Sequence, residues 1–106
     1  MAAHAYNARM SRSMVERRLQ EVGERLKQLR EELELTDEQA AHFNDAADEA
    51  RIRALVSETP LADREHQEAQ RHADAYQRHR SEVQTSIEQL EHKQDELLDR
   101  LTAESR

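Results

Sequence analysis

The sequence predicts an all-α fold, a long antiparallel helical hairpin of the coiled-coil type. Apolar residues recur at alternating steps of four and three on both sides of Pro60, which is the heptad period of packed helices. When the chain is folded back at Pro60, the two apolar stripes face each other, so that Phe43 meets Tyr76 and Val22 meets Leu97. The composition agrees, because 37% of the residues are charged and the chain has one glycine and one proline.

The first predicted helix begins near Ser11 or Ser13, because a serine hydroxyl is a favourable N-cap. We expect residues 1–10 to be frayed, since they are small and polar and carry no stripe. Residues 11–105 form the predicted single hairpin domain. The first stripe is Val15, Leu19, Val22, Leu26, Leu29, Leu33, Thr36, Ala40, Phe43, Ala47, Ala50 and Ala54.

Thr36 leaves the continuity of this helix open. The segment Thr36-Asp37-Glu38-Gln39 has the form of a capping box, which would start a separate helix. A full break there predicts a chain kinked into a three-helix arrangement. The heptad phase passes Thr36 without a skip, however, and this favours one continuous helix or a mild kink.

The bend is predicted at 57–60, in the segment Ser57-Glu58-Thr59-Pro60. A residue before proline avoids the α conformation, so the first helix should end here. Thr59 can then cap the second helix, with Pro60 at the first helical position, where its missing N–H has no cost. We expect the second helix to run to about Ala103. Its stripe is Ala69, Ala73, Tyr76, Arg80, Val83, Ile87, Leu90, Gln94, Leu97 and Leu101.

Two polar residues, Arg80 and Gln94, interrupt the second stripe. Arg80 should lie within reach of Asp37 or Glu38, and Gln94 should face Leu26. Polar residues at seam positions commonly fix the register of packed helices at some cost in stability. We therefore predict that Arg80 and Gln94 set the register of the hairpin.

No catalytic, metal-binding or cofactor-binding residue is predicted. The lack of cysteine excludes disulfides, thiolate zinc sites and cysteine nucleophiles, and a single glycine excludes a phosphate-binding glycine loop. The six histidines form neither the Glu-x-x-His nor the His-Glu-x-x-His spacing of helical metal sites. Because a two-helix rod has no concave interior, we expect a non-enzymatic protein without a cofactor.

The net charge of −7 is unevenly distributed. Residues 31–70 carry twelve acidic and three basic residues, which places an acidic surface at the bend end. Such a surface attracts basic protein surfaces or cations and repels phosphate. No apolar run approaches the roughly 20 residues that span a bilayer, and no signal-peptide core is recognisable. We therefore expect a cytoplasmic protein that does not contact a membrane.

Several apolar residues are not needed by the seam. They are Met10, Met14, Leu35, Ile52, Leu55, Val56, Leu61 and Leu98. Exposed apolar groups usually mark association, although these residues could instead pack as flanking core positions beside the seam. We predict a coiled-coil interaction protein that binds another protein or forms a homodimer. The predicted partner-binding tip is Glu58, Leu61, Asp63, Glu65, Ile52, Leu55 and Val56.

A hairpin with Glu58, Asp63 and Glu65 near its bend resembles the bacterial transcription factors of the Gre and DksA type. The segment Pro60-Leu61-Ala62-Asp63-Arg64 is similar to the acidic tip of the DksA type, although the chain lacks zinc-finger cysteines. These factors insert an acidic-tipped coiled coil into the secondary channel of RNA polymerase. The resemblance implies RNA polymerase as a partner, with Asp63 and Glu58 acting near its catalytic metal.

Binding to the ribosome or to nucleic acid through the basic terminal end is a third expectation. Residues 1–30 carry seven basic and three acidic residues. The basic residues are Arg9, Arg12, Arg17, Arg18, Arg25, Lys27 and Arg30. Mixed charge at helical spacing is more typical of ion pairs along one helix, so nucleic acid is the less expected partner.

Overall fold

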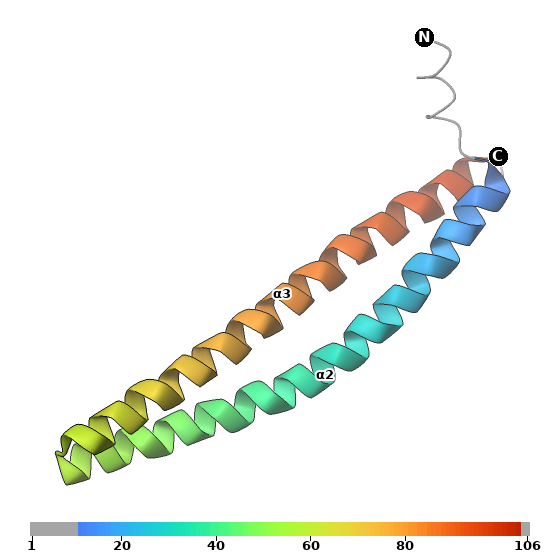
Figure 1. The fold of residues 1–106 in the computed structure, drawn as a ribbon. Coiled ribbons are helices and arrows are strands. Elements are labelled where there is room, and N and C mark those ends of the chain that lie inside the picture. Colours follow the sequence, from blue (N-terminus) through green and yellow to red (C-terminus); the bar gives the residue numbers. More distant parts are fainter. Residues whose placement is uncertain (1–10, 105–106) are drawn as a thin grey trace. The chain divides into compact units, whose positions relative to one another are not determined.

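A computed structural model describes residues 11–104 of the chain as two long helices (Figure 1). Helix α2 is Arg12–Ser57, helix α3 is Pro60–Glu104, and no strand occurs among the described residues. The predicted all-α helical hairpin is confirmed. The predicted frayed segment 1–10 lies outside the described part of the chain.

The chain divides into two compact units, and both helices take part in each of them. Among the described residues, the terminal unit joins residues 11–29 to residues 86–104, and the bend unit is residues 30–85. In each unit a stretch of α2 packs against a stretch of α3 that runs in the opposite direction, since the start of α2 lies with the end of α3. Each unit therefore has its own core.

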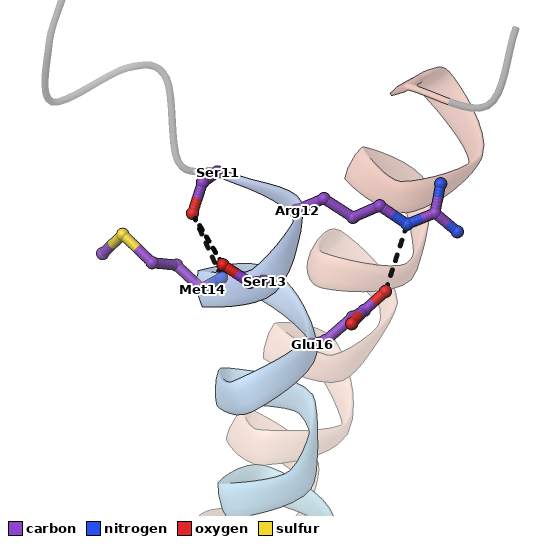
Figure 2. A network of polar contacts seen from close by, with 5 residues as sticks. All are labelled: Ser11, Arg12, Ser13, Met14 and Glu16. Atoms are coloured by element: carbon purple, nitrogen blue, oxygen red, sulfur yellow. Dashed lines mark hydrogen bonds and ion pairs between the residues drawn. The ribbon is translucent and has the colours of Figure 1, made fainter.

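Ser11 is the N-cap of α2. The Met14 N–H donates to Ser11 Oγ at 3.3 Å (Figure 2). The Val15 N–H donates to the Ser11 carbonyl at 3.0 Å. The Arg12 guanidinium donates to Glu16 Oε1 at 3.1 Å across the first turn. The Met14 N–H is one of the groups that a helix start leaves without an intrahelical partner, and its bond to the Ser11 side chain selects Ser11 over Ser13 as the cap.

Helix α2 continues through Thr36, so the break and the three-helix arrangement do not form. Thr36 is 2% exposed, and its hydroxyl donates to the Glu32 carbonyl at 2.7 Å. This bond to the preceding turn satisfies a threonine hydroxyl inside a helix, whereas a capping box would need the hydroxyl to accept from a following N–H. Continuation keeps Thr36 in the buried seam with Ala40, which is 3% exposed.

The bend uses two residues, Glu58 and Thr59, between the helices. Glu58 has a positive φ of 50°, and its N–H donates to the Ala54 carbonyl at 3.0 Å, which closes the last turn of α2. Thr59 Oγ1 accepts from the Ala62 N–H at 3.1 Å and caps α3. Pro60 is the first residue of α3. The stop and restart predicted at 57–60 are thus built from one left-handed residue and one cap.

Replacing Glu58 with glycine should raise the free energy of unfolding by about 0.5–1 kcal/mol. A residue with a Cβ resists the left-handed conformation, whereas glycine adopts it readily, and part of the gain is offset by glycine's larger freedom in the unfolded chain. Urea unfolding followed by circular dichroism measures the change. Ser57→Gly is the matched control and should destabilise, because Ser57 is still helical. Equal destabilisation by both changes would contradict this account of the bend.

The two units have cores of different character. The buried apolar residues of the terminal unit are large: Val15, Val22, Leu26, Leu29, Ile87 and Leu97. Those of the bend unit are mostly small: Ala40, Ala47, Ala50, Ala54, Ala62, Ala73 and Val83. Small side chains let two helix backbones approach closely, so the packing in the bend unit relies on the alanine seam and on one aromatic pair.

That aromatic pair confirms the predicted pairing of the two stripes in the bend unit. The rings of Phe43 on α2 and Tyr76 on α3 stack with their centroids 4.4 Å apart and their planes 10° from parallel. The ring of His72 meets Phe43 edge-on at 5.9 Å. Face-to-edge and stacked contacts of this kind add to the energy gained by burial alone.

Gly23→Ala should stabilise α2 by about 1 kcal/mol, because glycine inside a helix has more freedom to lose than alanine. Apart from its chain neighbours and the backbone of its own helix, a Cβ at Gly23 would meet no heavy atom within 4 Å, so the added methyl group causes no clash. The measurement is the midpoint of thermal unfolding, which should rise. An unchanged or lower midpoint would contradict the interpretation that Gly23 lies at an open helical position where alanine is more stable.

Candidate interaction surface at the bend

Four large apolar side chains lie exposed at the bend, and we call them the apolar collar. Ile52 is 55% exposed, Leu55 66%, Val56 80% and Leu61 61%. The first three are in the last two turns of α2 and Leu61 is in the first turn of α3. These exposures exclude the alternative that the collar residues are flanking core positions of the hairpin.

The position of the collar on α2 explains why α3 does not cover it. Ala50 and Ala54 are 2% and 8% exposed and form the inner side of the helix. Ile52 is two residues from each of them, which is about 200° around an α-helix. Val56 is likewise two residues from Ala54 and so lies on the opposite side of the helix from it. Helix α2 therefore has a narrow alanine face toward α3 and a bulkier apolar face turned away from it.

Exposed carboxylates lie in the turns next to the collar. The predicted tip residues Glu58, Asp63 and Glu65 are all exposed. Sequence reasoning missed three further exposed carboxylates in the preceding turns of α2, which are Asp45, Asp48 and Glu49. Their spacing of three, four and seven residues before Ile52 was the signal that could have identified them, because it places them near Ile52 on the helix surface.

The whole net charge of the protein lies in the bend unit. Residues 30–85 contain fourteen acidic and seven basic residues, which accounts for the net charge of −7. The rest of the sequence contains nine residues of each sign. An acidic field at the bend unit would draw in a basic partner and would repel nucleic-acid phosphate.

Of the two predicted register residues, Arg80 has a partner across the helices. Its Nε donates to Asp37 Oδ1, in an ion pair whose side chains are 35% and 46% exposed. Gln94 is half-buried and lies in the other unit. The structure thus brings Arg80 to one of the two acidic residues named for it, while the role of both residues in setting the register stays a prediction.

Reversing the charge at Asp37 tests whether its ion pair with Arg80 helps to set the register. Asp37→Arg would oppose two arginines and should destabilise by about 1 kcal/mol, and Asp37→Arg with Arg80→Asp should recover most of the loss. Both side chains are more than a third exposed, so solvent screening limits the expected coupling to about 0.2–1 kcal/mol. A double-mutant cycle from urea unfolding measures it. A coupling of zero would remove this pair as a determinant of register.

Three histidines of the bend unit contact other side chains. His79 Nε2 lies 3.3 Å from Glu32 Oε1 across the two helices. His42 and His72 both meet the ring of Phe43 edge-on. Within residues 11–104, no group of three His, Cys, Asp or Glu side chains is placed to hold a metal ion.

The second predicted apolar group, at the terminal unit, is smaller. Met14 and Leu98 are 54% and 47% exposed, and Met10 lies outside the described residues. Leu35 is also exposed, at 56%, and belongs to the bend unit. These residues do not form a group of four as the collar does, so the collar is the stronger candidate for an interaction surface.

Three surface hollows in the described part of the chain are each lined by residues of a single helix, for example Asp74, Arg78 and Glu82 of α3. No helix in the described part of the chain is both long enough and apolar enough to cross a membrane.

No protein-family model, curated protein or solved structure matches the chain.

Proposed function

We propose that this protein is a non-enzymatic helical hairpin that binds another protein, or a second copy of itself, through the apolar collar. The observation that carries the proposal is the exposure of Ile52, Leu55, Val56 and Leu61 by more than half. Exposed apolar groups gathered in one place and rimmed by polar residues usually mark an interaction site. The carboxylates near the collar supply such a rim.

The energetics favour covering the collar. Fully burying an exposed side chain of this size contributes roughly 1.5–3 kcal/mol, and more than half of that remains to be gained at each collar position. Four such positions can form the apolar centre of a small interface, since a few central side chains dominate the binding energy of most interfaces. The surrounding carboxylates would then contribute to the choice of partner and to the association rate.

Site-specific photo-crosslinking tests the proposal. A photoreactive amino acid is placed at Val56, in the collar, and in a matched variant at Glu24, an exposed residue of the terminal unit. After irradiation in native lysate, we expect a distinct adduct from position 56 that is absent from position 24. Light scattering on the purified protein separates self-association from binding to another protein. A monomer that gives no adduct, or the same adducts from both positions, would contradict the proposal.

The exposed carboxylates at the bend support a second candidate function, regulation of bacterial RNA polymerase by an acidic-tipped hairpin. Glu58, Asp63 and Glu65 lie at the tip without burial, which is what insertion into a channel toward a catalytic metal would need. The test is a Glu58→Ala, Asp63→Ala double variant in polymerase binding and in transcription, with Glu21→Ala as control. If purified RNA polymerase binds and transcribes identically with the wild-type and double-variant proteins, this candidate function is wrong.

A further inference from the structure

We propose that the collar and the carboxylates before it form one docking face for a basic amphipathic helix of another protein. The face consists of Ile52, Leu55 and Val56 with Asp45, Asp48 and Glu49, all on α2. Leu61 from the start of α3 extends it across the bend. This inference rests on the proposed function and names the chemistry of the partner.

The spacing of the apolar residues suits a packed helix. Ile52, Leu55 and Val56 stand at positions i, i+3 and i+4, which is how helices present anchors to one another. Ile52 and Val56 form a ridge one turn long, and ridges of this kind fit the grooves of a second helix. The side chains that would be covered are 55–80% exposed. A helix lying on this face would meet three anchors at once.

Other modes of peptide recognition fit the face less well. Residues 45–57 and 60–65 are helical, so their backbone groups bond within the helices, and no strand edge exists among the described residues for a peptide to extend. Proline-rich segments dock in aromatic-lined grooves, whereas the stacked rings of Phe43 and Tyr76 pair with each other across the helices. Packing of side chains from a second helix fits the face better than either of these modes.

The charges on the face specify a basic partner. Within residues 11–104, Asp45, Asp48 and Glu49 take part in no ion pair. Residues 45–65 contain six acidic residues and three arginines, so the arginines neutralise half of the negative charge. A second copy of this face would be equally acidic, and like charges brought together oppose association. Lysine or arginine beside the apolar stripe of a different protein would complement the face.

The test uses the full chain and a defined probe. The probe is a designed helical peptide with a leucine stripe flanked by lysines, and its twin has glutamate at each lysine position. In fluorescence anisotropy at low salt, the lysine peptide should bind at least about tenfold more tightly than its twin. Ile52→Gln with Val56→Gln should weaken its binding about tenfold or more. The control, Met14→Gln with Leu35→Gln, removes two apolar side chains that are 54% and 56% exposed outside the collar, and it should leave binding unchanged.

A third variant isolates the charges. Asp45→Asn, Asp48→Asn and Glu49→Gln together should weaken binding of the lysine peptide and flatten its dependence on salt. Circular dichroism confirms that each variant remains helical. Equal affinity for the two peptides, or wild-type affinity in the Ile52 and Val56 variant, would overturn the inference. If position 56 still gives its own photo-adduct in that case, the proposed function stands and the partner has different chemistry.

Discussion

Replacing Leu26 with alanine should lower the free energy of unfolding by about 2–4 kcal/mol. Leu26 is 0% exposed and belongs to the core of the terminal unit. Truncating a buried leucine loses the transfer energy of the removed atoms and leaves a cavity that neighbouring side chains fill only in part. Since small domains are stable by only about 5–15 kcal/mol, this loss is a large fraction of the total. Urea unfolding followed by circular dichroism measures it.

Leu35→Ala is the control for the Leu26 experiment. Leu35 has the same side chain on the same helix but is 56% exposed, so its replacement should change the stability by at most about 0.5 kcal/mol. A difference of several-fold between the two variants is therefore expected. Equal losses at Leu26 and Leu35 would mean that the inner and outer sides of α2 are assigned wrongly.

Phe43→Ala should destabilise by about 2–4 kcal/mol, the second large effect. Phe43 is half-buried, stacks on Tyr76 at 4.4 Å and meets His72 edge-on at 5.9 Å. In a unit whose buried apolar residues are mostly alanine, removing this ring takes away a stacked aromatic contact between the helices. Urea unfolding again provides the free energy.

A double-mutant cycle separates stacking from burial at this site. Phe43→Leu and Tyr76→Leu each keep an apolar side chain, and the pair should show a coupling of about 0.5–1.5 kcal/mol. Phe43→Leu with Ala75→Ser, which changes an exposed residue next to Tyr76, should be additive. Additivity of both double variants would show that the ring stacking contributes nothing to the pairing of the helices.

Most of the fold follows from local patterns in the sequence. The heptad steps on either side of Pro60 specify two helices, and the Thr59-Pro60 pair specifies where the second begins. The pairing of Phe43 with Tyr76 follows from counting outward from the bend, because an antiparallel hairpin has one register once its turn is fixed. The same count brought Arg80 to the region of Asp37 and Glu38, and the structure selects Asp37.

Other features could not be predicted, because local sequence admits more than one physical solution. Thr36 fits both a capping box and a mid-helix position, and the burial of its side chain in the seam decides for the second. The left-handed conformation of Glu58 is unusual for a glutamate and follows from the closure of the bend. The contact of His79 with Glu32 depends on side-chain conformations that spacing does not specify.

The candidate surface was predicted in part. Counting the residues that the seam does not use identified Ile52, Leu55, Val56 and Leu61, and the structure shows them exposed. Counting could not distinguish an exposed collar from a flanking core, because that depends on how wide the packed face of α2 is. The alanines at the seam make that face narrow. The role of the collar in binding stays a prediction until a partner is tested.

The distance between residues 32 and 79 tests the central claim, the antiparallel packing of α2 on α3, most directly. The chain has no cysteine, so Glu32→Cys with His79→Cys accepts two spin labels without further changes. Pulsed electron paramagnetic resonance, with excess unlabelled protein to suppress intermolecular distances, should give a narrow distribution below roughly 20 Å, since packed helix axes lie about 8–10 Å apart. A distribution centred several tens of ångströms higher would contradict the hairpin and the bend surface built on it.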